Sequence, residues 1–472
     1  MRGFIVLLLW LSVFEIHGQV NNDLTEICNQ GILSISVREV STGEEIFSHQ
    51  SSKLITPASI LKIIPTFESV DILGKEFRFK SELFYEGELS TDGTLAGNLV
   101  FQSDGDPTLA SKRIDTSDSI QTFFEKFTRL IKNKGIHCID GNVIISVNPQ
   151  KIYPQAPGWP ANDLGNYYAA GSWSLNVNEN EFEIHFDTRK AIGEKPEINS
   201  ILPNIHGLEI INQLAIDKAD TGDQAYIFNG AYSFTKVING TLPQGHKDFI
   251  IRGAIPDPPL FFKQELEKYL NNVNIAFNKI EIVENYIPQS TTEKIKTYES
   301  PSLIDIIKLT NTESINLYAD AIFNKLAEKL ELYNPDKIYQ HIFNRHDLLP
   351  SHEKYHLEDG SGLSPLNKIS TSLLSEYLVD WSKRHPDIGL KSLLPIAGKE
   401  GTVTKVFRNY KSPPSVFLKS GSMNMVQSYA GYIVSKKGTI FSIAFCANYC
   451  EQTQVDILHT FEKFTNDIYL SK

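Results

Sequence analysis

Segments with strand-like alternation fill the middle of this 472-residue chain, whereas helical spacing of apolar residues returns after residue 302. Near the start, two strand-like segments, 32–40 and 45–48, flank a Ser-Thr-Gly turn and predict a hairpin. Apolar residues at helical spacing then follow Ser59 and predict a helix that opens there. Because helices and strands stand at both ends and strands predominate between them, this order predicts a mixed α/β domain interrupted by a large insertion.

The other expected elements rest on the same spacing of apolar residues. Strands are expected at residues 99–102, 142–147, 181–186, 416–419, 428–434 and 440–447. Helices are expected at residues 119–132, 260–270, 302–309, 314–330, 370–382 and 453–469. Pro65 lies inside the helix that opens near Ser59. We expect it to kink or end that helix, because proline removes the hydrogen bond to the carbonyl four residues back.

The first 18 residues have the pattern of a signal peptide. Met1-Arg2 supplies a positive charge, residues 4–14 are almost unbroken apolar sequence, and His17, Gly18 and Gln19 end that run. A spanning helix needs roughly 20 apolar residues, so the run is short for a membrane anchor. No cysteine stands just after it to suggest a lipoprotein. We therefore expect export, with cleavage near Gly18 and no stable membrane span afterwards, and we exclude residues 1–18 from the fold.

The charge balance bears on the partners of the protein. The 45 basic and 56 acidic residues give a formal net charge of -11. An excess of negative charge argues against nucleic acid or an anionic membrane surface as the main partner. Nothing in the sequence fixes the oligomeric state.

Four cysteines, at positions 28, 138, 446 and 450, allow more than one arrangement. Export permits disulfides. Cys446 and Cys450 are close in sequence with an expected turn between them, so a bridge there is one arrangement. Two or more free buried thiols fit the sequence equally well, because spacing alone does not establish a pairing.

The first candidate motif is Ser59-Ile60-Leu61-Lys62. Helix positions three apart share one face, so the Lys62 amine can reach the Ser59 hydroxyl. A serine is a weak nucleophile until a neighbouring group takes its proton, and a lysine does so when burial or other cations lower its pKa. Taken alone, the motif is better interpreted as a serine and a lysine on an exposed helix face.

Two further short motifs follow. In Ser314-Ile315-Asn316, a serine and an asparagine two apart suit a loop or helix start with both polar groups in a cleft. A helix N-cap is the simpler interpretation of Ser314 alone. In Lys419-Ser420-Gly421, on an expected strand, the glycine lets a substrate backbone approach closely and the lysine can hold a carboxylate. An exposed lysine on an edge strand is the alternative there.

Together and in this order, the three motifs resemble those of the serine penicillin-binding proteins and β-lactamases. The long gap between the first two motifs resembles one branch, the D-alanyl-D-alanine carboxypeptidases and endopeptidases of peptidase family S13, of the class C low-molecular-weight type. Further segments similar to that branch extend the resemblance over nearly the whole mature chain. They are Gly105-Asp106-Pro107-Thr108-Leu109, Asp163-Leu164-Gly165-Asn166-Tyr167-Tyr168-Ala169-Ala170, Ala254-Ile255-Pro256-Asp257-Pro258, Asp359-Gly360-Ser361-Gly362-Leu363-Ser364 and Ala397-Gly398-Lys399-Glu400-Gly401-Thr402.

The resemblance implies the architecture and the partners. A serine β-lactamase/DD-transpeptidase-like α/β (α+β) catalytic domain would comprise residues 19–85 and 291–472. A large strand-rich insertion would form two further small domains, domain II at residues 86–172 and 247–290 and domain III at residues 173–246. Neither a cofactor nor a metal is implied. The implied partners are peptidoglycan stem peptides, with β-lactams as covalent inhibitors.

The resemblance also assigns roles to the residues of the first two motifs. Ser59 would be the acylated nucleophile, and Lys62 would be its general base. Ser314 would relay a proton to the leaving group, and Asn316 would bind the substrate amide.

The third motif and its neighbours receive binding roles in the same way. Lys419 and Ser420, with Gly421 beside them, would hold the terminal carboxylate of D-alanine. The backbone N–H groups of Ser59 and Ser422 would form an oxyanion hole, whose loss typically costs ~10²–10³ in rate. The pocket for the free D-amino end of the stem peptide would be lined by Asp163, Tyr168, Met423 and Asn424.

Three positions depart from the pattern of that family. Ile315 replaces a residue that is usually polar, and Ser420 replaces a commoner threonine but keeps the hydroxyl. Pro365 stands where many relatives have an arginine that pairs with a carboxylate at the free end. A cation at that end would have to come from another residue, such as Lys368 or Arg408.

A rival interpretation concerns His352-Glu353-Lys354-Tyr355-His356, which fits the H-E-x-x-H pattern of zinc metallopeptidases, with Glu376 downstream as a third ligand. That chemistry requires both histidines on one helix face. Pro350 precedes the motif and Asp359-Gly360 follows it, so any helix would be about two turns long and would lack a strong apolar face. We therefore interpret the segment as a polar surface loop and expect no zinc.

A non-catalytic cell-wall binder or penicillin sensor is a third interpretation, ranked low because every reactive group is present. The sequence does not decide between a carboxypeptidase, which trims stem peptides, and an endopeptidase, which cuts cross-links. The function predicted from the sequence is an exported, periplasmic or extracellular, penicillin-binding serine-type DD-peptidase.

Overall fold

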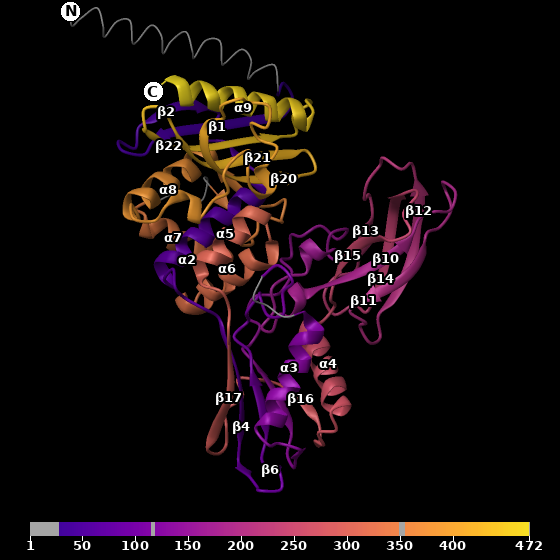
Figure 1. Ribbon diagram of the computed structural model, residues 1–472. Helices are drawn as coiled ribbons and strands as arrows, with labels where there is room; N and C mark the ends of the chain where they lie inside the picture. The colour runs from indigo at the N-terminus through magenta and orange to yellow at the C-terminus, as the bar shows by residue number, and fades with distance from the viewer. Residues whose placement is uncertain (1–27, 115–118, 349–354, 472) are drawn as a thin grey trace, which may run out of the picture. The chain divides into compact units, whose positions relative to one another are not determined.

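The computed structural model describes residues 28–114, 119–348 and 355–471 and divides into two compact units (Figure 1). Among the described residues, the first unit contains 28–72, Ile304–Ile315, 326–348 and 355–471. The second unit contains Leu73–Leu303 and Asn316–Lys325. The insertion expected from the order of segments is therefore present. The boundaries of the catalytic domain and of the two small inserted domains stay a prediction.

The first unit is built around one antiparallel sheet. Its strands follow the order β2 (Glu45–His49), β1 (Ile32–Glu39), β22 (Ile440–Asn448), β21 (Val426–Val434) and β20 (Ser415–Met423). Helix α9 (Gln454–Ser471) covers one face of this sheet and α8 (Thr371–Arg384) the other (Figure 1). The alternation of side chains fits this layering, because Phe445 packs in the cluster of α9 whereas Ser442 donates a hydrogen bond to Ser375 O of α8.

Shorter elements complete the first unit. They are β3 (Leu54–Ile55), the 3₁₀ turn η1 (Ala58–Lys62), α2 (Ile63–Ile72), α5 (Leu303–Glu313), α7 (Pro335–Arg345), β18 (Tyr355–His356), β19 (Lys368–Ser370), η5 (Leu390–Ser392) and η6 (Gly401–Val403). Helix α6 (Asn316–Leu330) contributes residues to both units.

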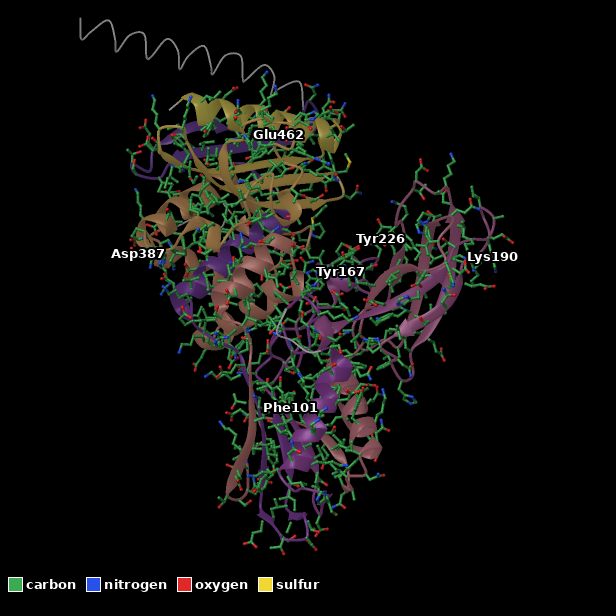
Figure 2. All side chains as sticks on the ribbon, in the orientation of Figure 1. Phe101, Tyr167, Lys190, Tyr226, Asp387 and Glu462 are labelled. Carbon is green, nitrogen blue, oxygen red and sulfur yellow. A yellow bond between two sulfur atoms is a disulfide. The ribbon has the colours of Figure 1, made fainter. Side chains whose placement is uncertain are left out.

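The second unit contains a five-stranded sheet and a set of smaller ones. The large sheet has the order β16 (Ile280–Glu284), β9 (Val143–Val147), β7 (Leu99–Gln102), β4 (Lys80–Glu86) and β17 (Thr292–Glu299). Helices α3 (Ile120–Asn133) and α4 (Pro258–Asn272) pack on it around Phe101, which stacks on Phe262 with ring centroids 4.8 Å apart (Figure 2). Aromatic pairs of this kind add stability beyond the area they bury.

The remaining strands of the second unit form three-stranded sheets. One contains β11 (Glu197–Leu202), β10 (Glu181–Asp187) and β15 (Phe249–Ala254). A second contains β12 (Glu209–Asp217), β14 (Thr235–Pro243) and β13 (Tyr226–Phe228). A third contains β5 (Glu88–Leu89), β6 (Thr94–Ala96) and β8 (Cys138–Ile139). Two 3₁₀ turns, η2 (Tyr167–Ala169) and η3 (Asn178–Asn180), precede β10.

The helices and strands expected from the spacing of apolar residues are confirmed, with ends displaced by a few residues. The expectation for Pro65 is wrong. Helix α2 begins at Ile63 and runs through Pro65 to Ile72. Proline is tolerated in the first turn, where the backbone N–H has no partner within the helix. The break lies one step earlier, where the 3₁₀ turn η1 ends at Lys62.

The disulfide joins Cys28 to Cys450, with Cα atoms 4.6 Å apart, whereas Cys138 and Cys446 are free. A bridge between Cys446 and Cys450 is therefore excluded. Cys446 lies on the face of β22 that Ser442 also occupies, toward α8, whereas Cys450 packs in the cluster on the α9 side. Tyr449, with φ of 58°, turns the chain between them. The interpretation of Cys446 as a free buried thiol is confirmed.

Within residues 28–471, excepting 115–118 and 349–354, no helix combines the length and apolar character needed to cross a bilayer. The expected signal peptide, residues 1–18, lies outside the described residues.

Candidate active site

Ser59 and Lys62 lie on the 3₁₀ turn η1, at the start of the buried helix α2. Lys62 Nζ donates hydrogen bonds to Ser59 Oγ at 2.9 Å and to Ser361 O at 2.6 Å. Lys62 is 0% exposed, whereas Ser59 is partly exposed. Ala58, just before the serine, has φ of 49°, a strained conformation for a residue with a Cβ. A partly exposed hydroxyl thus rests against a buried amine.

The segment before Ser59 is held by the end of β22. Thr56 N donates to Asn448 Oδ1 at 2.7 Å, and Asn448 Nδ2 donates to Thr56 O at 3.1 Å. One side-chain amide therefore satisfies both backbone groups of Thr56. No feature of the sequence pointed to Asn448, because the contact joins residues far apart in the chain.

Strand β20 approaches the serine closely enough to require a glycine. A Cβ at Gly421 would lie 2.4 Å from Ser428 Oγ, 2.8 Å from Pro57 O and 2.9 Å from Ser59 N. Ser428 Oγ already donates to Pro57 O at 2.6 Å. Any side chain at position 421 would collide with backbone atoms of η1 and of Pro57, which precedes it. The glycine of the third motif is thus explained by close packing against the serine.

Ser314 and Lys419 form a second contact in the first unit. Lys419 Nζ donates to Ser314 Oγ at 2.9 Å and to Ser420 O at 2.6 Å. Ser314 has φ of 60° and is not the N-cap of α6, which is Ile315, so the simpler interpretation of this serine fails. Burial, together with the positive charge of Lys62, lowers the pKa of Lys419 well below its ordinary value. The two lysines are therefore close enough for their charges to interact.

The rest of β20 presents polar groups toward its end. Ser420 Oγ donates to Thr402 Oγ1 of η6 at 2.8 Å. The sequence analysis included Thr402 in a family-like segment but assigned it no role. Ser422 and Asn424 are exposed and Met423 is partly exposed, at the turn into β21.

Asp359 organises the loop that supplies the carbonyl of Ser361. Its carboxylate accepts hydrogen bonds from Gly362 N at 2.7 Å, Ser364 N at 2.8 Å and Asn367 Nδ2 at 2.9 Å. The loop therefore fixes the Ser361 carbonyl, which accepts from Lys62. The Asp-Gly-Ser-Gly segment stood out in the sequence, but this role was missed, because a backbone oxygen leaves no mark on residue identity.

A second cluster lies within the second unit. Tyr168 OH donates to Asp163 Oδ1 at 2.8 Å, and Asn316 Nδ2 donates to Tyr168 O at 2.7 Å. Burial raises the pKa of Asp163, and the hydrogen bond from Tyr168 opposes that change. Hydrogen bonds thus link three candidate residues, although Asn316 is far from the other two in the sequence.

A lysine lies beside Pro365. Lys368 Nζ donates to Pro365 O at 2.6 Å and to Thr56 Oγ1 at 2.6 Å. Burial lowers the pKa of Lys368. The ammonium therefore contacts Thr56, in the segment that leads into Ser59. It also contacts Pro365, the position at which many members of the resembled family have an arginine.

The described part of the proposed zinc motif, Tyr355 and His356, is not helical. His352 and Glu353 lie outside the described residues. His356 is exposed and belongs to the two-residue strand β18, which pairs with β19.

The sequence profile of the D-Ala-D-Ala carboxypeptidase 3 (S13) family matches residues 19–466, and the chain belongs to this family. Among curated relatives, it is 24% identical over 436 residues to a D-alanyl-D-alanine carboxypeptidase of Haemophilus influenzae, covering 88% of this chain and 85% of the relative.

Solved structures of two proteins illustrate the similarity in fold. Penicillin-binding protein 4 from H. influenzae, solved alone and with a novel β-lactam, superposes in its free form with a TM-score of 0.78 at 20% identity, covering 95% of this chain and 99% of that one. A predatory peptidoglycan endopeptidase from Bdellovibrio bacteriovorus gives 0.52 at 15% identity, with 93% and 92% covered. The expected DD-peptidase fold with a strand-rich insertion is therefore confirmed.

Proposed function

We propose that this protein is a serine-type DD-peptidase that cleaves D-alanyl-D-alanine in peptidoglycan stem peptides through an acyl-enzyme on Ser59. The observation that carries the proposal is the hydrogen bond of 2.9 Å between Nζ of the buried Lys62 and the partly exposed Ser59 hydroxyl. Membership of a D-Ala-D-Ala carboxypeptidase family supports the same substrate.

In the proposed mechanism, neutral Lys62 takes the proton of Ser59 Oγ as that oxygen attacks the carbonyl carbon of the penultimate D-alanine. The negative charge that develops on the carbonyl oxygen is accepted by the backbone N–H groups of Ser59 and Ser422. The C–N bond then breaks, Lys62 returns the proton through Ser314 to the departing amine, and free D-alanine leaves. Water hydrolyses the ester on Ser59 and regenerates the hydroxyl.

Substrate binding is assigned to the remaining candidates. Lys419 and Ser420 hold the terminal carboxylate, since an anion bound beside the buried Lys419 on β20 favours the charged form of that lysine. Asn316 binds the substrate amide. Cleavage of D-alanyl cross-links, an endopeptidase reaction, uses the same acyl-enzyme with a larger leaving group, and the endopeptidase of similar fold supports it.

The proposal includes β-lactams as covalent inhibitors and export as the location. A β-lactam presents a strained amide to the same serine, and a protein of similar fold has been solved with a β-lactam bound. Export to the periplasm or cell exterior follows from the apolar N-terminal segment and the location of peptidoglycan.

The test is D-alanine release from a soluble pentapeptide that ends in D-alanyl-D-alanine. We expect turnover by the purified mature protein, and complete inhibition after incubation with penicillin. A protein that is labelled by penicillin but releases no D-alanine would instead be a non-catalytic sensor. Release that is insensitive to penicillin, lost with EDTA and restored by zinc would overturn the serine mechanism.

A second prediction concerns the free end of the stem peptide. Asp163 offers a carboxylate to the ammonium of the diamino acid, whereas Pro365 offers no cation to the carboxylate beside it. A charge-assisted hydrogen bond is worth roughly 1.5–3 kcal/mol. We therefore expect N-acetylation of that ammonium to lower kcat/KM by at least about tenfold and amidation of the neighbouring carboxylate to change it little.

The measurement compares D-alanine release from peptides with meso-diaminopimelate, its D-centre amide and its N-acetyl derivative. A large penalty for amidation would identify another cation, with Lys368 beside Pro365 as the first candidate and Arg408 as the second. A negligible penalty for acetylation would remove Asp163 from the binding site.

A further inference from the structure

Three consecutive residues before β10 adopt left-handed backbone conformations. Asn178, Glu179 and Asn180 have φ of 52°, 55° and 55°. Asparagine tolerates this region, whereas glutamate is disfavoured in it. Both asparagines brace the turn, because Asn178 Nδ2 donates to Glu181 O at 2.8 Å and Asn180 Nδ2 donates to Gly171 O at 3.0 Å. Glu179 thus occupies a strained position that its neighbours maintain.

The strained turn directs the Glu179 carboxylate into a buried set of donors. It accepts hydrogen bonds from Ser111 Oγ, from Arg113 Nε and, at 2.8 Å, from Tyr318 OH. Tyr318 is fully buried on α6, two residues after Asn316. The carboxylate therefore holds the first turn of the helix that begins with Asn316.

A chain of charged groups leads from Glu179 back to the partner of Asn316. Arg113 also contacts Glu181 at 3.8 Å, and Glu181 accepts from Arg252 at 2.9 Å. The Arg252 guanidinium lies 3.7 Å from the ring centroid of Tyr167, which is labelled in Figure 2. Tyr167 precedes Tyr168.

The two routes close into a ring. Asn316 Nδ2 donates to Tyr168 O at 2.7 Å, so the start of α6 and the turn η2 are joined directly. They are joined a second time through Tyr318, Glu179 and the chain of charged groups. All of these residues belong to the second unit.

We propose that Glu179 is a positioning residue for Asn316, which it fixes against Tyr168 through Tyr318 on one side and through Arg113, Glu181 and Arg252 on the other. The inference rests on the proposed function, in which Asn316 binds the substrate amide. It deepens that function, because Glu179 acts through Tyr318 on Asn316 and has no substrate-binding role of its own in that function.

Two physical observations favour positioning over simple stabilisation. Buried ion pairs contribute little net stability compared with apolar residues, but they specify one arrangement of the groups they join. Strained backbone persists where the surrounding structure enforces it, and such strain gathers at functional sites. Glu179 combines both features and contacts Tyr318, two residues after Asn316, so a role in fixing the position of Asn316 explains both.

The test is a double-mutant cycle on the full mature protein, with the rate constant for acylation by penicillin as the readout. We expect Glu179→Gln to lower that rate constant roughly 10- to 100-fold, since small misplacements of a binding group cost that much. In the Asn316→Ala background, Glu179→Gln should have almost no further effect, because the group it positions is gone. The matched control is Glu183→Gln, which removes a carboxylate from the same strand region, where its partners are His185 and the exposed Lys112.

Tyr318→Phe provides a second variant. It removes one hydroxyl and is therefore expected to destabilise the fold less than Glu179→Gln does. It should lower acylation in the wild-type background by a smaller factor, and again not in the Asn316→Ala background. Additive effects of Glu179→Gln or Tyr318→Phe in the two backgrounds, or wild-type rates in both variants, would overturn the proposal. A wild-type protein that penicillin does not acylate would instead contradict the proposed function itself.

Discussion

Replacing Lys62 by alanine is expected to lower the rate of acylation by penicillin by at least ~10²–10⁴-fold, the range for loss of a general base. The reason lies in the geometry, because the Lys62 amine is the group that contacts Ser59 Oγ and that burial keeps from water. The Ser361 carbonyl and the loop held by Asp359 fix the amine in this position. Time-resolved labelling with a fluorescent penicillin measures the rate constant.

A matched control for Lys62→Ala is Lys236→Ala in the second unit. Lys236 is also 0% exposed, and it donates to the carbonyls of Asn229 and Gly230. Its loss removes an equally buried amine with no hydroxyl partner among those contacts, so we expect near wild-type acylation of the folded variant. Acylation of folded Lys62→Ala at the wild-type rate would show that another group takes the serine proton.

Replacing Lys419 by glutamine is expected to lower both acylation and D-alanine release by roughly 10- to 100-fold. A buried charge-assisted hydrogen bond is worth roughly 1.5–3 kcal/mol, and about 1.4 kcal/mol corresponds to a factor of ten. Lys419 is the charged donor on β20 in the proposed carboxylate site, and it also contacts Ser314 Oγ. Lys437→Gln, at the exposed turn between β21 and β22, is the control. Wild-type kinetics of Lys419→Gln would remove this residue from the mechanism.

The same variant should change how stability depends on pH. The pKa of Lys419 is lowered by burial and by the charge of Lys62. Between this lowered pKa and the ordinary lysine value of about 10.4, the unfolded chain binds more protons than the folded protein, so stability rises with pH. The wild-type protein should therefore gain stability relative to Lys419→Gln as the pH rises toward that value. Denaturant unfolding at neutral and alkaline pH measures the difference, and equal gains would contradict the lowered pKa.

The local parts of the candidate site could be predicted from sequence, because they depend on spacing. Positions three apart bring Lys62 to Ser59 on a 3₁₀ turn much as they would on an α-helix. The contact between Ser314 and Lys419 joins motifs 105 positions apart, and only the resemblance to a family suggested it. The alternation of β22 explains why Cys446 remains free, but no local rule could pair Cys28 with Cys450 across 422 positions.

Other features could not be predicted, because they depend on backbone atoms or on conformations that oppose residue preference. The Ser361 carbonyl and the Asn448 clamp act on backbone groups. Glu179 adopts a left-handed conformation although glutamate does not favour it, so its contact with Tyr318 has no sequence signature. Such positions are where tertiary contacts override local preference, and functional sites are expected among them.

Mass spectrometry of the protein after incubation with penicillin tests the central claim most directly. We expect one adduct, with the mass of one intact penicillin, because the β-lactam ring opens without losing atoms when the serine oxygen attacks. After proteolysis the adduct should lie on the peptide that contains Ser59, and folded Ser59→Ala should carry none. An adduct on another residue, or labelling of folded Ser59→Ala, would contradict the account.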